Sequence, residues 1–164
     1  QMDLDANEVW RSSLPSTIDG KLRGLETAIS ISKSENSLSI WYDNGLVVDI
    51  SEDSGVEIDR RSLNIPDRIE RVFHSGESHL LALSGGGFLI SDGEKILESY
   101  STPGPLFAAI RRNGVWKFTG WRFDGRLSNL GLDISSREEL GVGFVADKVL
   151  TNDGTLFEFA VTRS

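Results

Sequence analysis

Histidine and carboxylate side chains are the groups through which this chain could do acid–base or metal chemistry, because the sequence contains no cysteine. The two histidines, His74 and His79, are five positions apart. An odd spacing on one strand puts two side chains on opposite faces, and even across a turn the pair would supply only two metal ligands. Neither histidine is followed by a nearby serine or aspartate in the arrangement of a nucleophilic triad. We therefore interpret one of them as a structural residue and the other as a surface residue.

Neighbouring carboxylates occur at Glu52-Asp53, Glu57 and Asp59, and Glu138-Glu139. A glycosidase needs two carboxyl groups across a cleft, one of them with a pKa raised by burial. Glu57 and Asp59 are two positions apart, so on a strand both would point to solvent. The run 85–87 is all glycine, but apolar strand residues follow it instead of the helix that a phosphate-binding loop precedes. The sequence thus predicts a protein that is not an enzyme and needs no metal or cofactor.

Short apolar, β-rich runs separated by turn dipeptides make up most of the chain. These dipeptides favour tight hairpin turns and include Asn44-Gly45, Asp92-Gly93, Asn113-Gly114 and Asp153-Gly154. No segment keeps a helical apolar stripe for more than about two turns. Residues 135–140 are the best helical candidate, because Ser135 and Glu138 fit a capping box. We predict one all-β domain over residues 1–164, built of antiparallel hairpins as a two-sheet sandwich or half-barrel, with a small or partial β-propeller as the alternative.

A loose repeat of strand, polar turn, strand, glycine turn and strand can be placed four times along the chain. Its units begin near Ala28, Glu70, Phe107 and Gly141. The spacings of 42, 37 and 34 residues are near the period of propeller blades.

The second unit carries a recognisable pattern within residues 69–91. Gly76, His79 and the pair Ala82-Leu83 stand as Gly-x-x-His-x-x-Ala-Leu. This pattern resembles the core of the repeats in the RCC1-like propeller family, and residues 148–158 contain a fainter copy. The resemblance implies blade-like antiparallel packing. It carries no chromatin or exchange-factor role, because the Gly-Gln-Leu-Gly linker segment of that family is absent.

The excess negative charge lies in the first third of the chain. Residues 1–59 hold 12 of the 25 acidic and 4 of the 17 basic side chains. The net charge of this segment is therefore −8, which equals the net charge of the whole chain. This layout disfavours general affinity for nucleic acids or anionic membranes and favours a cationic protein partner. We predict a partner-binding surface in which carboxylates pair with partner Arg and Lys while Trp41 or Tyr42 supplies an anchor. Its residues are Trp41, Tyr42, Asp43, Asp49, Glu52, Asp53, Glu57 and Asp59.

Residues 111–126 form the one basic and aromatic stretch. If Gly120 sits at a bulge, the side chains of four aromatic residues share one face of a core strand. These are Trp116, Phe118, Trp121 and Phe123. The alternative is a platform on which single-stranded nucleic acid stacks between cations. Those cations would be Arg111, Arg112, Lys117 and Arg122.

These patterns support three hypotheses of function. The first is a non-enzymatic acidic protein that neutralises a cationic protein in a 1:1 complex, as bacterial immunity proteins do for nuclease toxins, although no immunity-family motif is present. The second is a scaffold that binds a peptide or glycan in an aromatic groove around Trp116 and Trp121. The third is a single-stranded nucleic-acid binder acting through residues 111–126. The lack of a signal-like start and of a long apolar run predicts a cytoplasmic protein with no membrane contact.

Overall fold

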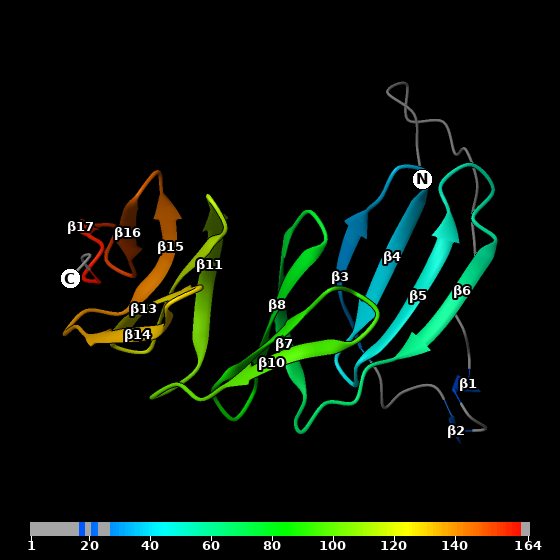
Figure 1. Cartoon of the computed structure of the whole chain (residues 1–164), viewed down its shortest axis with the longest axis horizontal. Coiled ribbons are helices and arrows are strands. Elements are labelled where there is room, and N and C mark those ends of the chain that lie inside the picture. Colours follow the sequence, from blue (N-terminus) through cyan, green and yellow to red (C-terminus); the bar gives the residue numbers. More distant parts are fainter. Residues whose placement is uncertain (1–16, 19–20, 23–26, 162–164) are drawn as a thin grey trace. The chain divides into compact units, whose positions relative to one another are not determined.

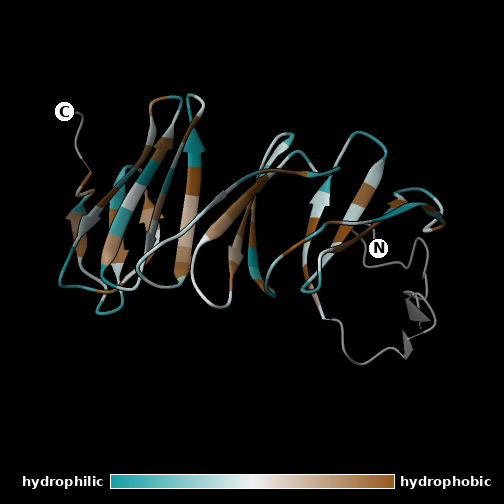
Figure 2. Ribbon diagram, turned by 60° about the horizontal axis from the view of Figure 1, so that its bottom comes forward, coloured by the Kyte–Doolittle hydropathy of each residue, from teal (hydrophilic) through white to brown (hydrophobic). Residues whose placement is uncertain are grey.

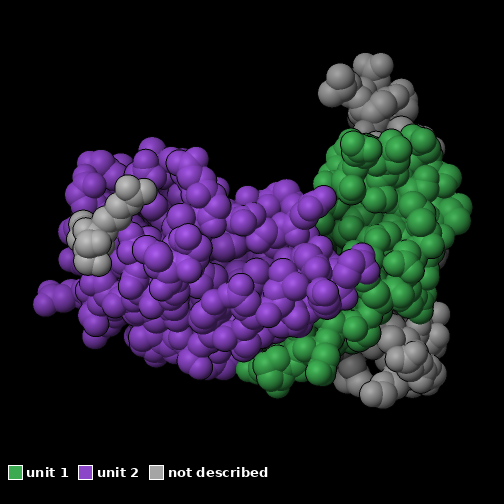
Figure 3. Space-filling model, viewed as in Figure 1, with its two compact units in different colours: residues 1–68 green, residues 69–164 purple. Residues whose placement is uncertain are grey.

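The computed structural model describes residues 17–18, 21–22 and 27–161. The chain divides into two compact units, residues 1–68 and 69–164, which Figure 3 colours separately. Within the described residues every regular element is a β-strand, and every strand pairs antiparallel with its neighbours in the sheet (Figure 1). The all-β prediction is therefore confirmed. The expectation of one domain over residues 1–164 stays a prediction.

The first unit contains a short hairpin and one four-stranded sheet. The hairpin is β1 (Thr17–Ile18) and β2 (Lys21–Leu22). The sheet follows the chain order, with β3 (Ala28–Lys33), β4 (Ser37–Tyr42), β5 (Leu46–Ser51) and β6 (Glu57–Ser62). Buried apolar residues lie in the two central strands, including Ile40 and Val48, which pair directly in register. The outer strand β6 is exposed along most of its length.

The second unit contains three sheets, each again in chain order. The first is β7 (Ile69–Ser75), β8 (Ser78–Leu83), β9 (Phe88–Ser91) and β10 (Ile96–Tyr100). The second is β11 (Leu106–Arg112), β12 (Val115–Gly120), β13 (Phe123–Ser128) and β14 (Gly131–Ser136). The third is β15 (Gly141–Val145), β16 (Lys148–Thr151) and β17 (Leu156–Glu158).

The four large sheets begin at Ala28, Ile69, Leu106 and Gly141. Each start lies within one residue of a predicted repeat unit, so the fourfold repeat is confirmed. The strands form four separate meanders and are not shared between two large sheets. The architecture therefore matches the partial-propeller alternative, in which each repeat makes its own blade-like sheet.

Aromatic side chains join the first two sheets of the second unit. The rings of Phe88 on β9 and Phe118 on β12 have centroids 4.9 Å apart, and Tyr100 on β10 stacks on Phe88 at 5.1 Å. Such ring pairs add about 0.5–1.5 kcal/mol beyond the burial of their apolar area. Figure 2 shows the same pattern along the chain, with hydrophobic segments in the strands and hydrophilic ones at many of the turns. The core of this unit thus lies between its sheets.

Two of the predicted local features are wrong. Residues 135–140 form no helix, because Ser135 and Ser136 end β14, where Ser135 pairs with Asp124 of β13. The stretch around Gly120 is not one bulged strand, because Gly120 pairs with Phe123 across a two-residue turn. That turn separates β12 from β13 and takes Trp121 off the face that carries the other aromatic side chains.

A buried carboxylate, that of Asp124, connects the second and third sheets. Its side chain is 0% exposed and accepts hydrogen bonds from Thr119 Oγ1 at 2.8 Å and from the backbone N–H of Ala160 at 2.9 Å. The guanidinium of Arg137, itself nearly buried, lies 3.4 Å away. The charge of Asp124 is thus compensated by three groups from different parts of the unit.

No helix within the described ranges has the length and apolar character required to cross a bilayer.

We predict that Gly125→Ala destabilises the second unit. A Cβ at Gly125 would lie 2.0 Å from Cε2 of the buried Phe118 ring, which has no room to move. Overpacking of this kind lowers the free energy of unfolding by about 1–3 kcal/mol. Urea denaturation of the variant and the wild type measures this difference. Gly143→Ala is the matched control, because a Cβ there meets only Leu150 atoms at 4.0 Å. Equal stability of the two variants would contradict the packing described.

We also predict that Asp124→Asn costs about 3 kcal/mol, because it removes the buried counter-charge of Arg137 and leaves that guanidinium only the longer contact with Glu139 at 3.9 Å. The control is Asp133→Asn, which removes the half-exposed partner of Arg126. That loss is expected to cost less than about 1 kcal/mol. Thermal and urea unfolding of both variants measure the free energy of unfolding. If Asp124→Asn loses no more stability than Asp133→Asn, the buried charge of Arg137 needs no partner.

Candidate binding site

The two predicted anchors of the acidic surface lie in the interior. Trp41 is 1% exposed and Tyr42 is 5% exposed, both on β4. The Trp41 indole N–H donates to Ser32 Oγ at 3.0 Å. Neither ring is presented to solvent, so an anchor on a partner-binding surface has to come from other residues.

Most carboxylates of the predicted surface are paired within their own unit. Asp43 is buried, accepts a hydrogen bond from the backbone N–H of Thr27 at 3.0 Å, and is paired with Arg68. Asp49 and Asp59 share the guanidinium of Arg61, at 2.5 and 3.5 Å. Their negative charge is therefore partly compensated before any partner arrives.

Two of the remaining acidic residues are paired in the same way. Glu57 forms an ion pair with Arg60 at 2.8 Å, and Glu52 one with Lys33 at 2.6 Å. Asp53 is exposed in the turn after β5, whereas Asp43 lies in the turn before that strand. A strand of this length separates its two turns by roughly 20 Å. The structure thus spreads these carboxylates over both ends of the sheet, and their role in partner binding stays a prediction.

The basic and aromatic stretch divides between the interior and two surfaces. Trp116, Phe118 and Phe123 are buried in the core of the second unit. Lys117 and Arg126 lie on the other face of β12 and β13, where they line a pocket. The stretch therefore offers no row of exposed rings between its cations, which is what stacking of single-stranded nucleic acid needs.

The turn between β12 and β13 carries the exposed aromatic side chain. Trp121 is 54% exposed, and the following Arg122 has φ of 60°, in the left-handed region that arginine rarely adopts. Two backbone hydrogen bonds hold this turn, from the N–H of Trp121 to the Pro105 carbonyl at 3.1 Å and from the N–H of Arg137 to the Arg122 carbonyl at 2.9 Å. The turn is thus held by backbone contacts while its two side chains remain available.

Gly104 provides the space beside this turn. A Cβ at position 104 would lie 3.2 Å from the Cβ of Trp121. The loop before β11 therefore lies directly against the base of the indole side chain and limits its freedom to move.

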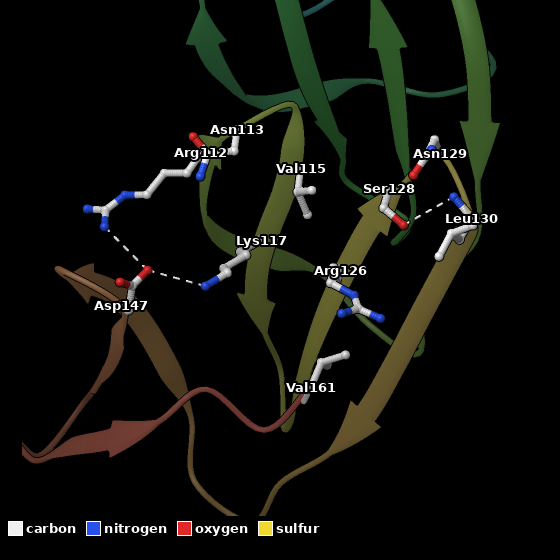
Figure 4. A pocket seen from close by; sticks show the side chains of 10 residues that line it. All are labelled: Arg112, Asn113, Val115, Lys117, Arg126, Ser128, Asn129, Leu130, Asp147 and Val161. Carbon is white, nitrogen blue, oxygen red and sulfur yellow. Dashed lines mark hydrogen bonds and ion pairs between the residues drawn. The ribbon is translucent and has the colours of Figure 1, made fainter. Parts of the chain in front are cut away.

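A pocket of about 690 Å³ lies at the other end of β12 (Figure 4). Arg112 and Lys117 point toward the same carboxylate oxygen, Oδ1 of Asp147, with Nη1 and Nζ at 3.3 and 3.2 Å. Lys117 Nζ also lies 5.3 Å from the centre of the Phe159 ring. Asp147 is in the turn between β15 and β16, so two sheets build this pocket. No local sequence pattern indicates this pocket, because Asp147 lies 30 residues after Lys117 and 35 residues after Arg112.

The two histidines face each other instead of lying on opposite faces. They are cross-strand partners on β7 and β8, with Nδ1 atoms 2.9 Å apart. One ring nitrogen must donate and the other accept in such a contact, so the pair holds one shared proton there. Groups of three or more metal-ligating side chains do not occur in the part of the chain that the structure describes.

No protein-family model matches the sequence, and neither does any curated protein. Solved structures do match the fold. The WD40 domain of Pan2 from Neurospora crassa aligns with a TM-score of 0.60 at 11% identity, over 81% of this chain and 47% of that one. The computationally designed protein Ika4 aligns with a TM-score of 0.63 at 10% identity, over 92% of this chain and 96% of that one.

A third match is PorZ, an essential bacterial surface component of the type-IX secretion system of Porphyromonas gingivalis. It aligns with a TM-score of 0.53 at 18% identity, over 79% of this chain and 20% of PorZ. The chain thus spans about half of the Pan2 WD40 domain and a smaller share of PorZ. At these identities the likeness concerns the fold alone, and it defines this chain as an array of β-propeller-like blades.

We predict that the histidine pair makes stability depend on pH. Burial lowers the pKa of His74 below its usual 6.5. The unfolded chain therefore binds protons more readily than the folded one, so the free energy of unfolding is highest above pH 6.5 and falls as the pH drops toward the lowered pKa. Urea unfolding of the wild type and of His74→Gln, above pH 6.5 and at about pH 5, measures this difference. The same pH dependence in both proteins would show that this histidine does not cause it.

Proposed function

We propose that this chain is a non-catalytic, propeller-type scaffold that binds a peptide or protein partner, with the Trp121–Arg122 turn as its main contact. The observation that carries the proposal is an exposed tryptophan beside an arginine in a strained conformation, on a turn fixed by two backbone hydrogen bonds. Tryptophan and arginine are the residue types that contribute most often to binding hot spots. Strained residues that the surrounding structure holds in place gather at functional sites.

A protein or peptide partner fits this turn better than a glycan. The predicted aromatic groove needs both Trp116 and Trp121, but Trp116 is 3% exposed and its indole N–H donates to Ser78 Oγ at 3.3 Å. One exposed ring provides an anchor but not the two walls of a groove. The likeness in fold to the WD40 domain of Pan2 supports a scaffold role.

Neutralisation of a cationic protein in a 1:1 complex is the weaker proposal. It depends on carboxylates that attract a partner, and several of these are already paired with arginines or a lysine of their own unit. The assignment to immunity proteins, the RCC1-like type of the repeats and the cytoplasmic location likewise remain proposals based on the sequence.

The scaffold proposal predicts that Trp121→Ala removes most of the binding energy. Peptides selected from a random display library on the wild-type protein would be synthesised, and their dissociation constants measured by titration calorimetry. Loss of a hot-spot residue costs about 2 kcal/mol or more, so the dissociation constant should rise by at least about thirtyfold. Leu97→Ala is the matched control, because Leu97 is an exposed apolar side chain on β10 of the same unit. Peptides that bind Trp121→Ala as tightly as the wild type would refute this site.

A further inference from the structure

We propose that the pocket at the β11–β12 turn is a recognition site for a carboxylate, and that its ligand is an acidic peptide segment with an apolar residue beside the acid. Nothing in the preceding function requires this pocket, because it lies at the opposite end of β12 from Trp121.

The first argument is the convergence of two cations. Arg112 ends β11 and Lys117 lies within β12, and both side chains reach a single oxygen of Asp147 (Figure 4). Their distances of 3.3 and 3.2 Å exceed the 2.7–2.9 Å that is usual for charge-assisted hydrogen bonds. The two cations therefore hold this carboxylate loosely, and the site can take a better-placed one.

The second argument concerns Asp147 itself. Its side chain is largely exposed, and the preceding Ala146 has φ of 54°, a left-handed conformation that costs energy for any residue with a Cβ. The turn thus places an acid at the mouth of the pocket, in contact with both cations. We interpret Asp147 as an internal substitute for the ligand, which competes with it for Arg112 and Lys117.

The third argument is the local charge. Arg126 also lines the pocket and is held by Asp133 of β14, with Nη2 and Oδ2 2.6 Å apart. Three cations therefore face two carboxylates, in a protein whose net charge is −8. The pocket is thus locally positive and attracts an acidic group at short range.

The fourth argument is the apolar part of the lining. Val115, Leu130 and Val161 border the pocket, and Leu130 is 89% exposed. A hydrogen bond from the backbone N–H of Leu130 to Ser128 Oγ at 3.2 Å fixes the turn that presents this side chain. A free phosphate would gain nothing from such contacts. A peptide with alternating acidic and apolar side chains would use both kinds of lining.

The volume of about 690 Å³ is within the usual size of small-ligand pockets and is large enough for two or three peptide side chains.

The probe is the peptide Glu-Leu-Glu-Leu-amide with fluorescein on its N-terminal amine, titrated with the full chain and followed by fluorescence anisotropy. We expect the Gln-Leu-Gln-Leu counterpart to bind at least about tenfold more weakly, because each lost charge-assisted contact accounts for roughly that factor. Asp147→Asn should bind the acidic peptide several-fold more tightly, because it removes the internal competitor. Arg112→Gln alone should weaken binding, and the double variant Arg112→Gln, Lys117→Gln should lose it.

Arg111→Gln is the matched control for this experiment. Arg111 is the exposed neighbour of Arg112, but it pairs in register with Trp116 and lines a different, smaller cavity. The variant Arg111→Gln removes one positive charge, as Arg112→Gln does, but from outside the pocket, so the affinity for the acidic peptide should not change. Trp121→Ala, at the other end of β12, should also leave this affinity unchanged. Because the affinity for the acidic peptide should not depend on Trp121, the pocket and the proposed scaffold site can each fail without the other.

Three results would overturn the proposal. Weaker or unchanged binding by Asp147→Asn would show that this carboxylate does not compete with the ligand. An equal loss for Arg111→Gln and Arg112→Gln would mean that only the overall charge matters. Competition by inorganic phosphate or by an oligothymidine strand at the same concentration as the unlabelled peptide would show a general anion site.

Discussion

A β-sheet with an apolar face cannot bury that face by itself, and this constraint governs the second unit. Phe88 and Phe118 meet from neighbouring sheets at 4.9 Å, which is possible only because Gly125 leaves space at the Phe118 ring. Gly141 has the same role at the next contact, since a Cβ there would lie 1.9 Å from Thr119 Oγ1. Close stacking of sheets thus depends on glycine at the contact points as much as on large side chains.

The same stacking explains why a charged group is buried. Where the second and third sheets meet, Asp124 accepts hydrogen bonds from its own sheet and from the backbone of Ala160, and Arg137 supplies the opposite charge. A buried ion pair contributes little net stability compared with apolar packing, but loss of one partner is costly. We therefore regard Asp124 as a device that fixes how the third sheet is placed on the second.

The sequence predicted the fold to the extent that its signals are local. Gly45, Gly86 and Gly154 have positive φ values of 87°, 90° and 85°. Turns of this kind are predicted directly by dipeptides such as Asn-Gly or by a run of glycines. The predicted repeat has three strands, whereas three of the sheets have a fourth, which is β6, β10 or β14. The strands β6 and β10 give little sequence signal because they are mostly exposed and lack apolar alternation. The aromatic spacing around Gly120 fits both a bulge and a turn, and only the pairing of Gly120 with Phe123 decides between them.

The distribution of charge along the sequence is a poor guide to the distribution of charge on the surface. Surface ion pairs form between groups that the fold brings together, so a segment rich in carboxylates need not be a negative surface. Asp49 and Asp59 share the guanidinium of Arg61. Asp147, by contrast, contacts two cations that precede it in the sequence by 30 and 35 residues, Lys117 and Arg112. Because such interactions decay within about 10 Å at ordinary salt, a partner responds to these local groupings and hardly to the total of −8. An acidic protein can for this reason hold a pocket that selects acids.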